Sequence, residues 1–239
     1  MFRSFRGALG AVLLLFAGLA PAASLRVAPL QVDLGKGQPI GRLQLFNDGN
    51  SDMVVDLRVR AWKIVDDRDV LSSTDEVIAV PPVARVPAGG QQLVRVGFRR
   101  PDLPGDVERS YRLVVTELPR PNPGPAQLQL QLRLLIPVFV APRAPPQPAL
   151  SLRLREEQGR LQLDAANAGN VHAKLTSLAL RDGRLGTLLS LPLNAYVMPG
   201  QSRSLPLSTP LPAAAIESAQ ALVLQGAQQR PEIQPIELP

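Results

Sequence analysis

The sequence contains no cysteine. It therefore has neither a disulfide framework nor a thiolate metal site, and the chain can fold outside the cytoplasm without help from oxidation. It has a single histidine, His172, so a histidine cluster for a metal ion is excluded as well. These absences predict a protein that uses no metal ion and no other cofactor.

Motifs for catalysis are also missing. One histidine would suffice for a Ser-His-Asp triad, but no serine lies in a GxSxG elbow, and there is no phosphate-binding glycine loop. His172 follows the turn at 167–170, which predicts a solvated side chain at a strand start. The acidic run Asp66–Asp69 lacks the spaced ligands and distal Glu of a calcium loop, so an exposed loop is expected. The sequence does not predict an enzyme.

The charge balance narrows the class of partner. The formal net charge is +6, and no basic run is interleaved with aromatic residues, which make up 4% of the chain. Nucleic-acid binding therefore has little support. A partner with an acidic surface or a C-terminal carboxylate is favoured instead.

The first residues have the pattern of an export signal. Arg3 and Arg6 precede an apolar run over 8–20, which ends in Ala20-Pro21-Ala22, a small-residue cleavage site. Residues 1–22 are predicted to be a secretory signal peptide, and the alternative is an uncleaved anchor. The run is too short to favour a membrane-spanning helix. The mature chain is expected to be soluble and extracytoplasmic.

The most informative stretch is Pro125–Pro142, which alternates strictly between apolar and polar residues. The apolar positions are Leu128, Leu130, Leu132, Leu134, Ile136, Val138 and Val140, and Gln127, Gln129, Gln131 and Arg133 lie between them. Alternation of this kind predicts a β-strand with one apolar face. Two interpretations stay open: a central strand of a large sandwich, or an edge strand that pairs with another chain by strand addition.

The rest of the chain reads as two β-sandwich domains. Short alternating segments separated by turns run through residues 23–141 and again through 150–239, and a proline-rich linker joins them at 142–149. The predicted fold is all-β, with two immunoglobulin-like sandwiches. The predicted strands are 25–34, 41–46, 53–64, 77–80, 92–98, 109–117, 150–155, 160–165, 171–180, 185–193, 204–207 and 221–224. The turns at 47–50 and 167–170 suggest a repeat of one design.

With the order of elements established, the chain resembles the PapD-like periplasmic pilus chaperones. The motifs that carry the resemblance are Leu45–Gly49, Trp62, Ala79–Val86, Gln92–Val96, Glu108–Leu113, Glu117–Pro119 and Ile136–Phe139. The last three are most similar to the archaic subgroup that serves spore-coat-protein-U-like fimbriae. The matches cover roughly residues 25–142, and the second half matches in size and strand content.

The resemblance implies a function. A chaperone of this family lends its last first-domain strand to a fimbrial subunit that lacks one, and delivers the subunit to an outer-membrane usher. The matching positions here are Leu128, Leu130, Leu132, Leu134 and Ile136. Arg95 and Glu108 match a structural ion pair of the family. A free chaperone can also be capped by a second copy of itself.

One departure concerns the anchor for the carboxylate at the subunit's C-terminus. Most family members hold it with an Arg and a Lys, and the matching positions here are Gln31 and Pro137. Neither can donate a charge-assisted hydrogen bond. The basic candidates for a replacement are Arg26, Arg85 and Arg133.

The sequence therefore favours a non-catalytic periplasmic chaperone for the biogenesis of fimbriae at the cell wall. The alternative from another class is an exported adhesin or structural surface component built of immunoglobulin-like domains. A secreted hydrolase is disfavoured because its motifs are missing.

Overall fold

The computed structural model describes residues 25–35, 37–100, 104–119, 131–183, 188–208, 213–227 and 230–238. Within these ranges the chain is almost entirely β, with one 3₁₀ turn at Ala213–Ala215 and no helix long and apolar enough to cross a membrane. The predicted signal peptide and the first part of the leucine-rich stretch, including Leu128 and Leu130, lie outside the described residues.

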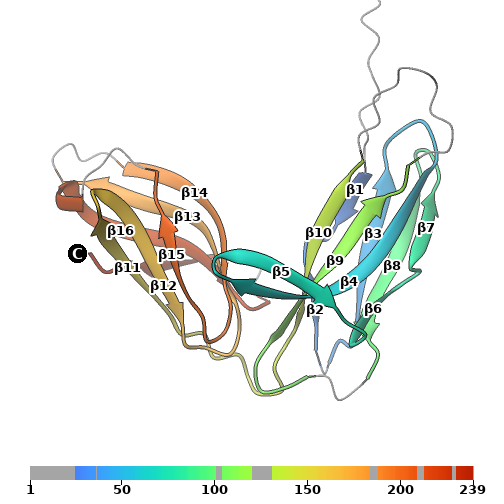
Figure 1. The fold of residues 1–239 in the computed structure, drawn as a ribbon, viewed down its shortest axis with the longest axis horizontal. Helices are drawn as coiled ribbons and strands as arrows, with labels where there is room; N and C mark the ends of the chain where they lie inside the picture. Colours follow the sequence, from blue (N-terminus) through green and yellow to red (C-terminus); the bar gives the residue numbers. More distant parts are fainter. Residues whose placement is uncertain are drawn as a thin grey trace, which may run out of the picture.

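The first half of the chain forms a sandwich of two sheets (Figure 1). One sheet has the order β1-β3-β8-β6, and the other has the order β2-β10-β9-β4-β5, with β7 also paired to β4. The strands are β1 (Leu25–Ala28), β2 (Val32–Leu34), β3 (Ile40–Asn47), β4 (Met53–Val65), β5 (Arg68–Ser73), β6 (Val77–Val80), β7 (Val83–Val86), β8 (Gln91–Phe98), β9 (Arg109–Glu117) and β10 (Arg133–Val140).

The second half forms another sandwich, set at an angle to the first (Figure 1). Its sheets have the orders β11-β12-β15 and β14-β13-β16-β17. The strands are β11 (Leu150–Glu157), β12 (Arg160–Asn167), β13 (Ala173–Asp182), β14 (Leu188–Val197), β15 (Ser202–Pro206), β16 (Ile216–Gln225) and β17 (Glu232–Pro235). The predicted all-β class with two immunoglobulin-like sandwiches is confirmed.

Period-two patterning explains why these segments are strands. On β4, Val55, Leu57 and Val59 are buried in the first core, and the residues between them are more exposed. On β12, Leu161 and Leu163 enter a separate core in the second sandwich. Each sandwich therefore buries one apolar face of each sheet against the other.

The suggested internal repeat is visible in two buried asparagines. Asn47 ends β3, and its Nδ2 donates to the carbonyls of Ser51 and Val86 at 2.8 and 3.0 Å. Asn167 ends β12, and its Nδ2 donates to the carbonyls of Val171 and Val197 at 2.8 and 2.9 Å. In both turns the Oδ1 accepts from the amide of the glycine two residues on. One side chain thus ties the same kind of turn in each domain.

Three strands were not predicted. β5 is exposed along most of its length and shows no alternation, so the pattern of the acidic run suggested only a loop. β7 follows Pro81-Pro82 directly, and prolines weaken a strand prediction. β17 is a short, mostly exposed edge strand. β5 and β17 are held by pairing with a neighbour rather than by an apolar face of their own, whereas β7 buries Ala84 and Val86 in the first core.

The two domains meet through a small apolar layer, which we call the junction cluster. It contains Trp62, Ile64 and Phe139 from the first domain and Tyr196 and Met198 from the second. The ring centres of Trp62 and Tyr196 lie 5.1 Å apart in an edge-on arrangement. The β4–β5 hairpin reaches toward the second domain (Figure 1), where Asp67 accepts from Arg203 at 2.8 Å.

The asparagine turns generate a stability prediction. Asn167→Ala leaves the buried carbonyls of Val171 and Val197 without a donor, so we expect a loss of about 2–4 kcal/mol in the free energy of unfolding. Asn47→Ala should cost a similar amount in the first domain. Urea denaturation measures both losses. The control is Asn50→Ala at an exposed turn position, which should stay within about 0.5 kcal/mol of the unmodified protein. Equal free energies of unfolding for all three variants would contradict the structural role of the two buried asparagines.

Candidate functional site

The first half of β10 is paired on only one side. Arg133–Val140 runs antiparallel to β9 along its whole length, whereas β2 pairs only with Val138–Val140. Among the described residues, Arg133–Pro137 has no ladder partner on its outer edge. β10 lies on the side of the first sandwich that faces the second (Figure 1).

The ladder shows which backbone groups face outward. Leu132 O accepts from Glu117 N at 2.9 Å, and Leu34 O accepts from Ala141 N at 2.8 Å. Because alternate residues of a strand point their hydrogen-bonding groups to opposite sides, the even-numbered residues bond to β9 and the odd-numbered residues face outward. Arg133 and Leu135 therefore present outward N–H groups that no described strand pairs, and Pro137 presents only a carbonyl.

The side chains of β10 divide between two faces. Ile136 is buried in the first core, and Leu132 and Leu134 are half-buried at its edge. Arg133 and Leu135 are exposed on the opposite face. Leu132 therefore packs against the edge of its own sandwich rather than lying free of it.

A polar cleft of about 350 Å³ lies beside this edge, between the two domains. Leu135 and Pro137 of β10 line one side of it, and Lys174 of β13 and Tyr196 of β14 line the other. Three cationic side chains line the cleft, namely Arg112, Lys174 and Arg203, against one carboxylate, Asp69. The surplus of positive charge makes the cleft suited to an anion.

Arg112 is the most buried of these cations. Its guanidinium lies 3.5 Å from the centre of the Trp62 ring and 5.5 Å from that of Tyr196. Its contacts with Asp69 and with the Leu135 carbonyl are long, at 3.4 and 3.5 Å. Its Nε is buried without an acceptor in the structure. A guanidinium has five N–H donors, so most of the hydrogen-bonding capacity of Arg112 is unused.

The charge of Arg112 is incompletely compensated. Burial lowers the pKa of Arg112 below its usual value, and the charge of Asp69 opposes that shift. The Asp69 side chain is 46% exposed, so water weakens its attraction for the 11%-exposed arginine. A carboxylate that entered the cleft would find a desolvated cation with free donors.

The basic residues predicted from the sequence lie elsewhere. Arg26 stacks over Phe46 and donates to Asp48 at 3.0 Å, and Arg85 donates to Asp52 at 2.8 Å. Arg133 is exposed on β10. None of the three lines the cleft. Gln31, which the resemblance matches to a family arginine, donates to Asp33 at 2.9 Å.

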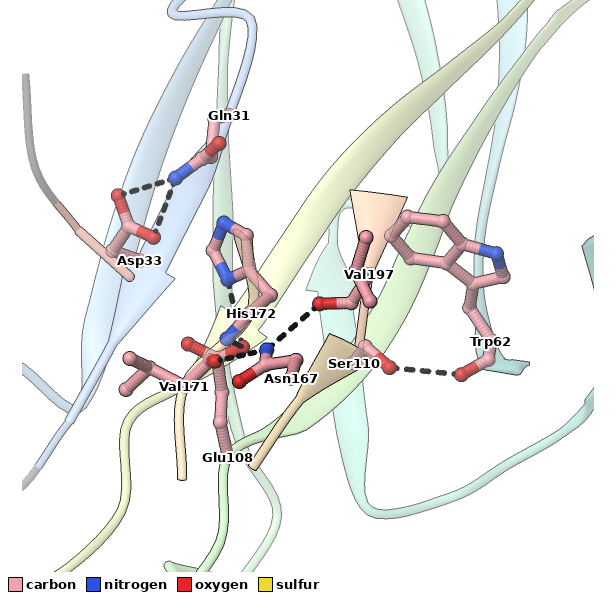
Figure 2. Close-up of polar contacts among 9 residues, drawn as sticks. All are labelled: Gln31, Asp33, Trp62, Glu108, Ser110, Asn167, Val171, His172 and Val197. Atoms are coloured by element: carbon pink, nitrogen blue, oxygen red, sulfur yellow. Dashed lines mark hydrogen bonds and ion pairs between the residues drawn. The ribbon is translucent and has the colours of Figure 1, made fainter. Parts of the chain in front are cut away.

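The predicted ion pair of Arg95 with Glu108 is wrong. Arg95 is exposed on β8. The Glu108 carboxylate accepts instead from the His172 backbone N–H at 3.0 Å and lies 2.7 Å from His172 Nδ1 (Figure 2). His172 was expected in solvent, but it is 1% exposed. Glu108 thus connects the two domains rather than two strands of the first.

The sequence did not identify Arg112 and Lys174 as site residues, because the alternation of polar and apolar residues describes the packing within one domain at a time. Trp62 and Arg112 lie on the polar face of their strands, yet they are 2% and 9% exposed because the second domain covers them. A tryptophan among arginines on the polar face of β4 was the available signal, since a large aromatic side chain there needs a cover.

A comparison with protein families identifies the first domain. Residues 24–146 match the model described as the pili and flagellar-assembly chaperone, PapD N-terminal domain. The chain is also 36% identical over 122 residues to the chaperone protein FimB/FhaD of Bordetella pertussis. That match covers 47% of this chain and 47% of that protein, so the chain spans about half of this curated relative.

Solved structures resemble both domains together. The structure of the CsuC–CsuE chaperone–tip adhesion subunit pre-assembly complex, from archaic chaperone-usher Csu pili of Acinetobacter baumannii, matches with a TM-score of 0.67 and 24% identity, over 90% of this chain and 99% of that one. The Salmonella enterica SafA pilin in complex with the SafB chaperone matches with a TM-score of 0.62 and 19% identity, over 89% and 96%. At these identities the likeness establishes the fold.

The geometry of Arg112 generates a second prediction. Arg112→Met keeps an apolar stem over Trp62 and removes a poorly paired buried charge, while the half-exposed Asp69 stays solvated. We expect the free energy of unfolding in urea to fall by no more than about 1 kcal/mol, or to rise. The control is Arg58→Met at an exposed site on β4. A loss above about 3 kcal/mol would show that Arg112 is a structural ion-pair partner rather than an under-paired cation.

Proposed function

Because the chain belongs to the pili and flagellar-assembly chaperone family, we propose that it is a non-catalytic periplasmic chaperone that captures fimbrial subunits by completing their fold with β10. The observation that carries this proposal is the outer edge of β10 over Arg133–Pro137, which no strand in the described part of the chain pairs. A strand edge with free N–H and C=O groups is a template for another strand.

The first step is backbone pairing. Arg133 offers an outward N–H and C=O. Leu135 offers an outward N–H and a carbonyl that has only the long 3.5 Å contact from Arg112. Pro137 is the last outward position before the residues that β2 pairs. Proline is compatible with this position because its missing N–H would face the open edge. A subunit strand would therefore add before the segment that β2 already covers.

The second step is side-chain burial. Leu132 and Leu134 are half-buried at the rim of the first core, and part of each side chain remains for a partner to cover. Leu128 and Leu130 continue the same period upstream and complete the proposed series with Ile136. Full burial of a leucine is favourable by about 1.5–3 kcal/mol, so an apolar groove in the subunit would gain most from these positions.

The third step is recognition of the subunit's C-terminal carboxylate. We place this anchor at Arg112, with Lys174 and Arg203 as neighbouring cations, because the three line the cleft beside β10. Arg112 has an unused Nε–H and only long contacts to its present partners. It can therefore donate shorter hydrogen bonds to a carboxylate that enters the cleft. The cleft would take the place of the Arg and Lys that Gln31 and Pro137 do not supply.

Two further partners follow from this role. An outer-membrane usher must receive the loaded chaperone, and Val54, Val83 and Leu118 expose apolar surface at 38%, 51% and 37% where β4, β7 and the end of β9 meet. That surface lies away from the cleft-lining residues and suits a second docking event. A second copy of the chain would cap the same β10 edge in the absence of a subunit.

Capture of a subunit tests the proposal. The matched pair is Leu135→Pro and Leu135→Ala: both shorten an exposed side chain, but only proline removes an outward N–H that β9 does not use. When the chain is co-expressed with a fimbrial subunit that the unmodified chain captures, Leu135→Pro should lose capture about tenfold or more relative to Leu135→Ala, at similar thermal stability. Arg112→Met should also lose capture.

Control samples separate binding from folding. The thermal midpoint of each purified variant is measured before its capture of the subunit is compared, so a variant that fails to fold is not counted as a binding defect. Equal capture by the proline and alanine variants would overturn strand addition at this edge. Retention of capture by Arg112→Met would remove Arg112 as the anchor while leaving strand addition in place.

A further inference from the structure

His172 occupies the boundary between the two domains. It directly precedes β13, and its ring stacks on Phe139 of β10 at 3.6 Å between centres and 13° between planes. The Tyr196 ring lies 5.7 Å away on β14. A residue of the second domain is therefore packed directly on the strand that carries the open edge.

The polar contacts of His172 also cross the boundary. Its Nδ1 and its backbone N–H both meet Oε1 of Glu108, at 2.7 and 3.0 Å. The Glu108 backbone N–H donates to the Asn170 carbonyl at 3.0 Å, so the two domains exchange hydrogen bonds in both directions. The Glu108 side chain is 4% exposed, which leaves water little part in this contact.

A second carboxylate lies on the other side of the ring. Figure 2 shows the remaining ring nitrogen of His172 turned toward Gln31 and Asp33 of the first domain. Asp33 lies on β2 opposite Phe139 in the ladder, and both of its carboxylate oxygens accept from the Gln31 side chain. Burial raises the pKa of Asp33, an effect that the Gln31 hydrogen bond and the charge of His172 oppose and that Glu108 reinforces.

We propose that His172 is a pH-dependent latch between the domains, which tightens when its ring gains a second proton between Glu108 and Asp33. A carboxylate only accepts hydrogen bonds, so in the neutral ring the proton is on Nδ1 and is donated to Glu108. The other nitrogen is then an unprotonated atom facing a second carboxylate. Protonation there turns it into a donor and adds one positive charge between two acidic groups.

The sign of the pH effect follows from the same groups. Imidazoles titrate between about pH 5 and 8. Acidification across that range therefore places a positive charge on the ring between the two carboxylates. The raised pKa of Asp33 acts in the same direction, because its buried charge opposes folding above that pKa and the penalty is lost as the pH falls through it.

Other charged groups near the latch do not reverse this sign. Burial raises the pKa of Tyr196, so its hydroxyl stays neutral in this range. Lys174 and Arg112 lie 5.3 and 5.5 Å from the Tyr196 ring.

The chain carries its own reporters for this latch. His172 is the only histidine and Trp62 the only tryptophan, and Trp62 belongs to the junction cluster with Phe139. On a chain without a histidine tag, the imidazole is titrated by NMR while Trp62 fluorescence and the thermal midpoint are followed on the same samples. We expect the Trp62 signal to change with the imidazole midpoint and the thermal midpoint to rise by about 2–4 °C on acidification.

Variants separate the latch from a general pH effect. His172→Gln keeps a donor for Glu108 but cannot titrate, so its Trp62 step should vanish between pH 5 and 8 and its gain in thermal midpoint should shrink to the part that Asp33 contributes. Asp33→Asn removes one of the two facing charges and should shrink the step. Asp48→Asn alters an exposed ion pair with Arg26 and should leave it unchanged.

Two results would overturn the proposal. One is a Trp62 signal that stays flat while the imidazole titrates in the unmodified chain, a comparison that does not depend on any variant folding. The other is a step of the same size in His172→Gln. Neither result bears on capture by β10, so the latch and the proposed chaperone function fail independently.

Discussion

The backbone of β10 bonds to β9 on one side and, over Arg133–Pro137, to no described strand on the other. Backbone N–H and C=O groups need partners, and an open edge invites another strand. The arrangement depends on β2, which covers only the last three residues of β10 because it spans only Val32–Leu34. A longer β2 would close the edge and leave an ordinary sandwich.

The second domain makes this edge specific. Its packing on Trp62 and Phe139 places Lys174 and Tyr196 across the cleft from Arg112, beside the open half of β10. The open edge of β10 and the desolvated Arg112 thus lie side by side. The edge is a property of the first domain alone, whereas the burial of Arg112 needs both domains. The Glu108–His172 contact keeps the two domains in that relation.

Alternating patterns predicted the fold class and most strands, because a sandwich buries one face of each sheet inside one domain. Residues buried by the other domain escaped the same reasoning. Arg112 and His172 are polar residues at positions that patterning assigns to solvent, and only the packing of the two domains against each other buries them. The misassigned pair of Arg95 and Glu108 has the same origin, since the partner of Glu108 is 64 residues away in the second domain.

Hydrogen exchange on β10 tests the central claim most directly. Arg133 and Leu135 carry the two outward amides, while the amides of Leu134 and Ile136 bond to β9 and serve as internal references. In the free chain the outward amides should exchange fast and the references slowly. In the complex purified with a fimbrial subunit, the account predicts strong protection of Arg133 and Leu135 with little change at the references. Fast exchange of both outward amides in a fully loaded complex would contradict it.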